Sequence, residues 1–274
     1  MFLLPRTPSY QTKLKEKRGQ GKGKDYIPWH KVQEVPSKGR STTMFSWSVD
    51  REHHLLSDLE RSYFYILDWS DQVTDIREQY PILPLEKTII IAERLGIKHP
   101  ALNNRKPPEQ VVTTDFLVNV GDRLFARSIK YMKDLADRRT IEKLQIEQTF
   151  WEEQGVDWGI VTEIEIPKNI VDNIQFLHKA YYEEQLPAEL SKTHILRIEK
   201  AIWERLHDEQ SLSHACMEVD ALLGLEDGTS LYLVRHFLAI KKWKVDMTIR
   251  INPSLPIKLI SEDNNCLFAS DGGA

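Results

Sequence analysis

Two short apolar stretches in the middle of the chain alternate in the way that neighbouring β-strands do. Residues 113–118 and 124–129 are rich in β-branched and apolar side chains, and Gly121 and Asp122 between them are typical of a tight turn. The pattern predicts a β-hairpin. Shorter stretches of the same kind predict further strands over residues 42–47, 73–79 and 158–162.

Apolar residues at helical spacing predict three helices around these strands. The first runs from His53 to Trp69. The second covers residues 85–95, with Gly96 as its left-handed terminator, and the third runs from Asp137 or Arg138 to Gln154. Strand, hairpin, helix and strand in this order predict an α/β domain, a mixed sheet flanked by helices, over residues 25–166.

Beyond about Pro167 the pattern becomes predominantly helical. Helices are predicted over residues 169–184, 187–206, 211–223 and 230–241, and a strand over residues 244–251. Helices closed by a strand favour a winged-helix-like domain over residues 167–274, which would offer four basic side chains to DNA: Arg235, His236, Lys241 and Lys242. A helical domain that docks on another protein is favoured about equally by the same pattern.

The composition is that of an ordinary globular protein. Of the 274 residues, 41% are hydrophobic and 28% are charged. No apolar run approaches the length of about eighteen residues that a membrane span needs, and residues 1–10 lack a signal-peptide core, so neither is expected. Cys216 and Cys266 have no metal-type spacing, which argues against a disulfide framework and favours a cytoplasmic protein.

Positive charge is concentrated at the start of the chain. Residues 1–24 carry seven basic side chains and one acidic one, a local charge of +6, which leaves −10 for the rest of a chain whose net charge is −4. One interpretation is a basic arm in which Lys22 and Lys24 contact the DNA backbone. The other is a solvated terminus without a partner, which the charge pattern by itself favours.

The predicted hairpin brings an acid and a lysine within reach of each other. Asp115 lies near the start of its first strand and Lys130 at the end of its second, so both can enter one small volume if they share a face. A carboxylate can hold a hard cation, and an ammonium beside it can stabilise charge that develops on a phosphate. Solvent-exposed edge residues are the commoner explanation of such a pair. Glu60, beside the apolar stripe of the helix predicted from His53, is expected by default to make a surface ion pair.

Six motifs in the first part of the chain occur in an order and at a spacing that resemble a known family. They are GQGKGKDYIPW, VQEVPSKGR, HHLLSDLE, TDIREQYPILP, GIKHP and TTDFLV. The resemblance, dense from about Gly19 to Trp158, is to the TnsA family, the endonuclease subunits of heteromeric cut-and-paste bacterial transposases. It implies a restriction-endonuclease-like first domain, a winged-helix-like second domain, and three catalytic positions: Glu60, Asp115 and Lys130.

The resemblance also implies a division of labour at the transposon ends. A protein of this kind cuts the 5′ strands, a separate TnsB-like transposase cuts and joins the 3′ ends, and a TnsC-like ATPase regulator couples cutting to the choice of target. Two alternatives stay open. One is a stand-alone restriction-like nuclease, and the other is a non-enzymatic DNA-binding or scaffold subunit.

One position departs from the family pattern. Two residues before the lysine, this nuclease pattern usually has an acid or, in TnsA, a glutamine, whereas this chain has Ser128. We expect Glu60, Asp115 and the main-chain carbonyl of Ile129 to hold Mg²⁺, for which Mn²⁺ can substitute. Ser128 would be a weak ligand, because its hydroxyl is neutral and short. It is also the one residue that favours the non-enzymatic alternative.

Overall fold

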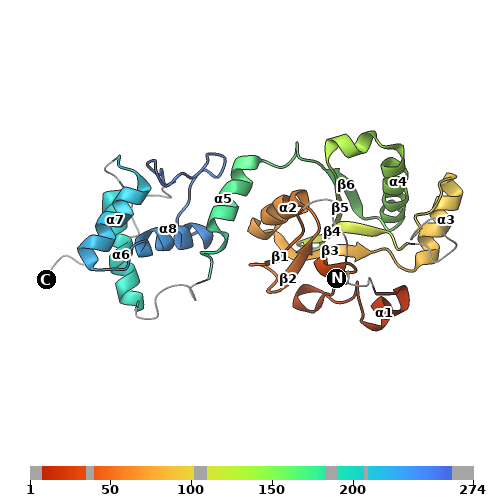
Figure 1. Ribbon diagram of the computed structural model, residues 1–274, viewed down its shortest axis with the longest axis horizontal. Coiled ribbons are helices and arrows are strands. Elements are labelled where there is room, and N and C mark those ends of the chain that lie inside the picture. The colour runs from red at the N-terminus through yellow and green to blue at the C-terminus, as the bar shows by residue number, and fades with distance from the viewer. Residues whose placement is uncertain (1–7, 35–39, 102–109, 183–189, 207–208, 261–274) are drawn as a thin grey trace, which may run out of the picture. The chain divides into compact units, whose positions relative to one another are not determined.

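The structure is a computed structural model that describes residues 8–34, 40–101, 110–182, 190–206 and 209–260 (Figure 1). The chain divides into two compact units, Met1–Ile166 and Pro167–Ala274. Within the described ranges, no helix is both long enough and apolar enough to cross a membrane.

The first unit is built on a four-stranded sheet in the order β3-β4-β5-β6. Its strands are β3 (Val73–Pro81), β4 (Thr113–Val120), β5 (Arg123–Ile129) and β6 (Asp157–Val161). The first three are antiparallel to their neighbours, and β6 is parallel to β5. The predicted hairpin is confirmed, because β4 and β5 are joined through Gly121, whose φ of +55° is the left-handed conformation that glycine adopts without strain.

The helix predicted from His53 begins five residues later than expected. Residues 52–55 form β2 (Glu52–Leu55), which pairs antiparallel with β1 (Thr42–Phe45) in a separate two-stranded sheet. The helix α2 (Asp58–Trp69) starts after Ser57, whose side chain accepts a hydrogen bond from the main-chain N–H of Glu60. The prediction was wrong here because Leu55, which seemed to continue the helix, is a buried strand residue.

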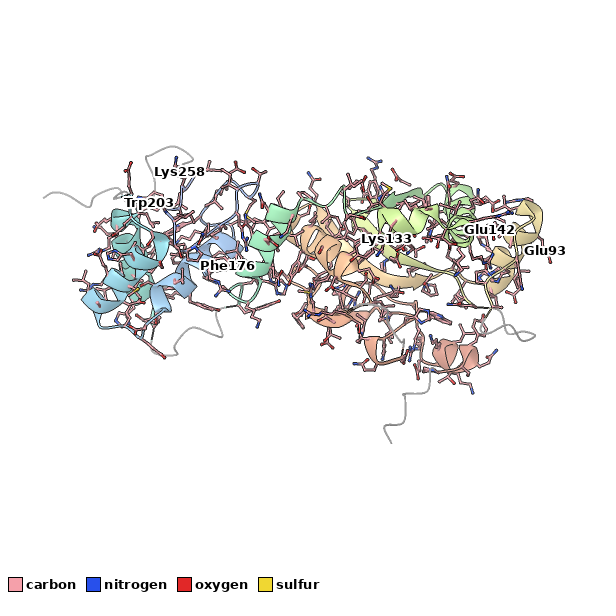
Figure 2. All side chains as sticks on the ribbon, turned by 45° about the horizontal axis from the view of Figure 1, so that its top comes forward. Glu93, Lys133, Glu142, Phe176, Trp203 and Lys258 are labelled. Atoms are coloured by element: carbon pink, nitrogen blue, oxygen red, sulfur yellow. The ribbon has the colours of Figure 1, made fainter. Side chains whose placement is uncertain are left out.

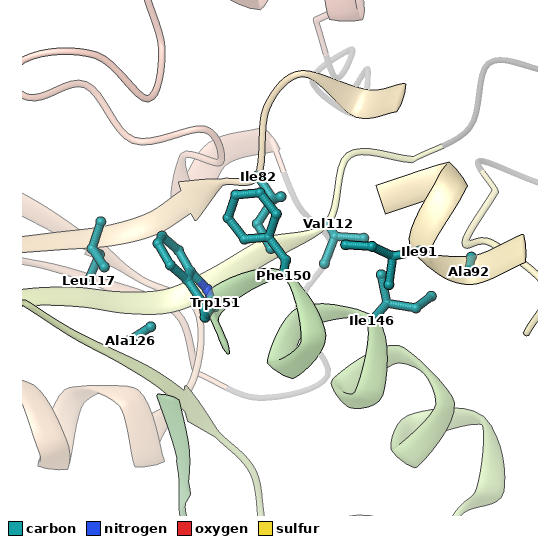
Figure 3. Close-up of a cluster of buried hydrophobic side chains, with 9 residues drawn as sticks. All are labelled: Ile82, Ile91, Ala92, Val112, Leu117, Ala126, Ile146, Phe150 and Trp151. Carbon is teal, nitrogen blue, oxygen red and sulfur yellow. The ribbon is translucent and has the colours of Figure 1, made fainter. Parts of the chain in front are cut away.

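Two helices, α3 (Leu85–Leu95) and α4 (Arg138–Glu153), pack with the sheet to form a buried apolar cluster (Figure 3). The cluster consists of Ile82, Ile91, Ala92, Val112, Leu117, Ala126, Ile146, Phe150 and Trp151. Both helices end near glycines in the left-handed conformation, Gly96 and Gly155, as the sequence predicts. The helix α4 also forms the crossover connection between β5 and the parallel strand β6, so this packing holds the connection against the sheet.

The basic segment at the start of the chain folds onto the first unit from residue 8 onward. It contains α1 (Tyr10–Lys15), and short 3₁₀ turns cover residues 23–25, 32–34 and, later in the chain, 132–136. The Arg18 guanidinium donates to both carboxylate oxygens of Glu34 at 2.6 and 2.7 Å, and the Tyr26 hydroxyl donates to the Glu78 carbonyl at 3.0 Å. Residues 8–24 are therefore part of the unit that carries the sheet.

The second unit is mainly helical, as predicted. Its helices are α5 (Lys168–His178), α6 (Lys192–Arg205), α7 (Leu212–Leu223) and α8 (Thr229–Ala239). Gly224 ends α7 in the left-handed conformation, directly after the predicted helix range 211–223. Pro187, expected in the first turn of a helix, lies outside the described residues.

The strand predicted over residues 244–251 is wrong. Its only sheet-like contact among the described residues is a single bridge between Val245 and Leu259. Hydrogen bonds from a side chain take the place of strand pairing here. The Asn173 amide donates to the main-chain carbonyls of Met247 and Ile249 at 3.0 and 2.8 Å. Alternating apolar residues here pack as an irregular loop instead of a strand.

Candidate active site

Asp115 and Lys130 lie side by side where β4 and β5 meet. The Lys130 ammonium donates to Asp115 Oδ2 at 2.7 Å and to the main-chain carbonyl of Ile129 at 2.9 Å. The main-chain N–H of Ile129 donates to the same Oδ2 atom at 2.7 Å. The proximity that the hairpin predicted is therefore present, with the ammonium bridging a carboxylate and a carbonyl oxygen.

Glu60 enters the same region from the first turn of α2. Its main-chain N–H donates to Ser57 Oγ at 3.1 Å, and its carboxylate in return accepts from the Ser57 hydroxyl at 2.9 Å and from the Leu56 N–H at 3.0 Å. This exchange is a capping box, so the helix start itself orients the carboxylate. Gln79 on β3 adds a third donor, with its Nε2 atom 3.2 Å from Glu60 Oε2. Glu60 is only 6% exposed, so the expected surface position is wrong.

The electrostatics of these groups show an excess of buried negative charge. Burial, with the Asp115 charge as the next contribution, raises the pKa of Glu60 to about 7. Burial on its own lowers the pKa of a lysine, but the Asp115 carboxylate outweighs it and raises the pKa of Lys130 above its ordinary value. A group of carboxylates that resists full ionisation is one that an additional cation would stabilise.

Ser128 contacts a residue that the sequence did not indicate. Its hydroxyl lies 2.6 and 2.7 Å from the two carboxylate oxygens of Glu147 on α4, and the indole N–H of Trp158 donates to Glu147 at 3.1 Å. Glu147 is buried, and this burial, together with the Asp115 charge, raises its pKa to about 7. A glutamate on the apolar stripe of α4, between Leu144 and Phe150, was the signal that could have identified it.

The oxygen atoms in this region fit a hard divalent cation. The Lys130 ammonium already occupies a cation position on Asp115 Oδ2 and the Ile129 carbonyl, which shows that these two atoms converge. In the described part of the chain no group of three or more Asp, Glu, His or Cys side chains is arranged to hold a metal unaided. Two carboxylates and one carbonyl, with water completing the shell, is the ligand set in which Mg²⁺ is commonly bound.

The predicted DNA contacts of the first unit lie on its surface. Lys22 and Lys24 are exposed beside a 3₁₀ turn whose Gly23 N–H donates to Asp75 Oδ1 at 3.1 Å. Their role stays a prediction, but their position leaves both ammonium groups accessible.

The basic residues of the second unit differ among themselves. The Arg235 guanidinium donates to the Phe176 carbonyl at 2.6 and 2.9 Å, and lies over the ring of Phe176, which Figure 2 shows on α5. His236 is buried and lies 2.8 Å from the Ala180 carbonyl. The Lys242 ammonium donates to the buried Glu199 at 2.6 Å.

Arg235, His236 and Lys242 thus have contacts within their own unit. Lys242 is nevertheless exposed, Arg235 and Lys241 are half-buried, and His236 is buried. His236 is therefore not available to DNA as expected, and the role of the other three stays a prediction. The position of these basic residues near the end of a predicted helix could not show which of them pack inside the unit and which lie on its surface.

Two protein-family models match successive parts of the chain. The first, described as "TnsA-like endonuclease N terminal", matches residues 70–163, and the second, "TnsA endonuclease C terminal", matches residues 165–247. The first match includes Asp115, Ser128, Lys130 and Glu147, whereas Glu60 precedes it.

A curated relative matches over most of both chains. The "Transposon Tn7 transposition protein TnsA" of Escherichia coli is 43% identical over 234 residues, which cover 83% of this chain and 81% of the relative. Identity of this extent, together with the two family models in the expected order, shows that the chain belongs to the TnsA family and is a transposon endonuclease subunit.

Proposed function

We propose that this endonuclease subunit hydrolyses the non-transferred (5′) strands at transposon ends, with Mg²⁺ as its metal. The family implies a divalent ion and a transposon system that acts on DNA. The observation that supports the assignment of the site is the bridge from the Lys130 ammonium to Asp115 and the Ile129 carbonyl. Glu60 is buried beside it and supplies a second carboxylate.

In this proposal Glu60, Asp115 and the Ile129 carbonyl hold Mg²⁺, and Mn²⁺ can substitute because it accepts the same oxygen ligands. The bound ion supplies Lewis-acid chemistry: it polarises a non-bridging phosphate oxygen and lowers the pKa of a coordinated water. Lys130 turns its ammonium toward the scissile phosphate, where it stabilises the developing negative charge. The water oxygen attacks phosphorus in line, and the bond to the 3′ oxygen breaks, leaving a 3′-hydroxyl and a 5′-phosphate.

Ser128 and Glu147 support this arrangement from the other side of Asp115. The short hydrogen bonds between them hold a buried carboxyl group near Asp115 and Lys130, both of which influence its pKa. We propose that Glu147 supplies the acidic function that the nuclease pattern usually places at position 128. Ser128 then acts as the donor that orients Glu147, instead of as the weak metal ligand first expected.

The partners follow from the same proposal. A TnsB-like transposase would cut and join the 3′ ends, and a TnsC-like ATPase would regulate both subunits. Outside residues 1–24 the chain carries a net charge of −10 (−4 less the local +6), so its own attraction for DNA is weak and a partner is expected to bring the substrate. The candidate phosphate contacts remain Lys22, Lys24, Arg235, Lys241 and Lys242.

Strand-resolved cleavage of a labelled transposon end tests the proposal. The wild-type protein and Asp115→Asn would be compared with Mg²⁺, each with and without the cognate transposase. We expect the 5′ strand to be cut only by the wild type and only in the mixture. Cleavage by the isolated chain would instead establish an independent nuclease. A mixture that cuts only the 3′ strand would show that the site is inactive.

A further inference from the structure

Gln79 has a backbone conformation that its residue type disfavours. It lies within β3, is 3% exposed, and has a φ of +49°. In this left-handed region the Cβ atom of any residue other than glycine crowds the following carbonyl, so glycine or asparagine is the usual occupant. A buried glutamine that persists there is held by its surroundings, and such residues cluster at functional sites.

The surroundings of Gln79 fix the strand on both sides of it. Pairing with β4 is regular at Glu78, opposite Phe116, and at Tyr80, opposite Thr114. The Gln79 carbonyl accepts a hydrogen bond from the Trp29 N–H at 3.2 Å. The left-handed residue therefore lies between two regularly paired positions of β3.

That position is level with Asp115. Since Glu78 lies opposite Phe116 and Tyr80 opposite Thr114, the register places Gln79 beside Asp115. On the other side of β4, Phe116 lies opposite Arg127, which places Ser128 beside Asp115 as well. Asp115 is thus flanked in the sheet by two neutral polar residues.

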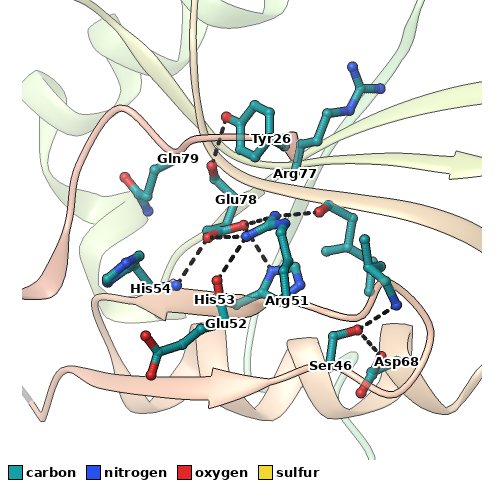
Figure 4. Close-up of polar contacts among 12 residues, drawn as sticks. Tyr26, Ser46, Arg51, Glu52, His53, His54, Asp68, Arg77, Glu78 and Gln79 are labelled. Atoms are coloured by element: carbon teal, nitrogen blue, oxygen red, sulfur yellow. Dashed lines mark hydrogen bonds and ion pairs between the residues drawn. The ribbon is translucent and has the colours of Figure 1, made fainter. Parts of the chain in front are cut away.

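Each flanking residue holds one buried glutamate from a helix. Ser128 donates to Glu147 of α4, and the Gln79 amide donates to Glu60 of α2. The Gln79 side chain leaves the strand in a different direction from the Glu78 carboxylate, which belongs to a separate polar cluster (Figure 4). Leu56 and Ser57, the other donors to Glu60, belong to the start of α2 itself, so Gln79 is the donor that joins this carboxylate to the sheet.

We propose that Gln79 is a positioning residue, which orients the Glu60 carboxylate toward the cation that it shares with Asp115. The inference rests on the metal site of the proposed function. The unfavourable backbone conformation is retained because the amide that it directs at Glu60 cannot be supplied by glycine, and because asparagine is one methylene too short to make the same contact.

The test uses two substitutions that suit the left-handed backbone. Gln79→Gly and Gln79→Asn both remove the contact with Glu60 and relieve the backbone, so both are expected to stay folded. Electron paramagnetic resonance of the free ion measures the affinity of the full chain for Mn²⁺. This affinity should fall about tenfold in each variant, which is the loss typical for residues that orient metal ligands. Cleavage in the assembled system should return toward the wild-type rate at saturating Mn²⁺, whereas Glu60→Gln, which removes a ligand, should not recover.

Asp50→Gly is the matched control. Asp50 also has a positive φ, of +54°, but is exposed, so its variant relieves the backbone and should leave Mn²⁺ affinity unchanged. If both Gln79 variants bind Mn²⁺ with wild-type affinity, the proposed role of Gln79 is overturned. If cleavage still depends on Glu60 in that case, the proposed function stays intact. Absence of Mn²⁺ binding by the wild type would overturn both.

Discussion

Lys130 contacts the two oxygen atoms that the proposed metal ion would also use, so the proposed function gives it two roles in different states. Without metal its ammonium balances Asp115 and lies on the Ile129 carbonyl. With the proposed metal bound, those oxygens would be shared and the lysine would be free to turn to a phosphate. Removing the Lys130 side chain should therefore lower the cleavage rate, and it should change the stability of the fold much less.

We predict that Lys130→Ala and Asp115→Asn each lower 5′-strand cleavage by at least about a hundredfold, the usual loss for a group that stabilises transition-state charge. Lys133→Ala is the control, because Lys133 is an exposed lysine three residues further on (Figure 2). Single-turnover cleavage in the assembled system measures the effect, and gel filtration with the partners shows whether assembly is retained. A wild-type rate in either variant would refute the catalytic assignment.

Ser128 is explained by the carboxylate that it faces. An acid at this position would lie against Glu147, which is already buried and 2.6 Å away. We predict that Ser128→Asp lowers the melting temperature by about 5 °C at pH 8 without divalent ions, because two buried carboxylates repel each other. Adding Glu147→Gln should restore most of the loss, since an amide can donate to the new carboxylate. Equal melting temperatures for the single variant and the wild type would show that the site is less crowded than the structure indicates.

Sequence reasoning identified some of these residues and missed others for a physical reason. The spacing of the hairpin showed that Asp115 and Lys130 could meet if they shared a face, because strand register is a local property. It did not predict that Glu60 is buried or that Glu147 and Gln79 lie nearby, because those contacts join segments far apart in the chain. A glutamate on an apolar helix stripe and a glutamine inside a predicted strand were visible, but only the fold shows what they contact.

The hairpin of β1 and β2 is fastened to β3 by a buried ion cluster (Figure 4). The Arg51 guanidinium donates to Glu78 Oε1 at 3.0 Å, and His53 Nδ1 lies 2.8 Å from Glu78 Oε2. The N–H of His54 donates to Glu78 Oε1 at 3.0 Å. Helical spacing could not reveal this hairpin, since His53 and Leu55 are buried as strand residues, with the His53 ring packed against Phe64 of α2. The helices whose predicted ends match the structure best, α3, α4 and α7, each have a terminal glycine or a side-chain cap.

This cluster gives the first unit a defined response to acid. Burial would raise the pKa of the Glu78 carboxyl, but His53 and Arg51 outweigh it and hold the pKa well below the usual range. A depressed pKa contributes stability that is present above the unfolded-state value, about 4.5, and is lost as the pH falls toward the folded-state value.

We predict that Glu78→Gln destabilises the first unit by about 3 kcal/mol at pH 7, because Arg51 is left buried without its counter-charge. The difference from wild type should shrink as the pH falls below about 5, where the wild-type carboxylate begins to lose its advantage. Urea unfolding at a series of pH values measures both, and Glu52→Gln, at an exposed position on β2, is the control. A difference that grows toward low pH would contradict the sign of the argument.

All residues of the candidate site belong to one of the two units. Glu60, Gln79, Asp115, Lys130 and Glu147 lie within Met1–Ile166, while the second unit is closed by contacts of its own, such as the one between Lys242 and Glu199. The division into a mixed sheet and a helical unit was visible in the sequence, because the change from strand to helix periodicity at Pro167 is a local signal. The irregular segment after residue 243 was not, because its order comes from Asn173, more than seventy residues away.

We therefore predict that a chain ending at residue 166 binds Mn²⁺ with the affinity of the full protein, within about a factor of three, since no ligand of the proposed site lies beyond that point. Mn²⁺ titration of both chains under identical conditions tests this, with Asp115→Asn in the shorter chain as the background. Loss of binding in the shorter chain would mean that the second unit contributes to the metal site.

The folded N-terminal segment sets a limit on where the protein can be shortened. A chain begun at residue 25, the boundary that composition favours, would lose Arg18 and leave its partner Glu34 with an unbalanced charge. The same segment continues directly to Tyr26 and Trp29, which donate to the main-chain carbonyls of Glu78 and of the left-handed Gln79. Trimming into residues 8–29 is therefore expected to change the proposed metal site from a distance, through the main-chain carbonyls of Glu78 and Gln79.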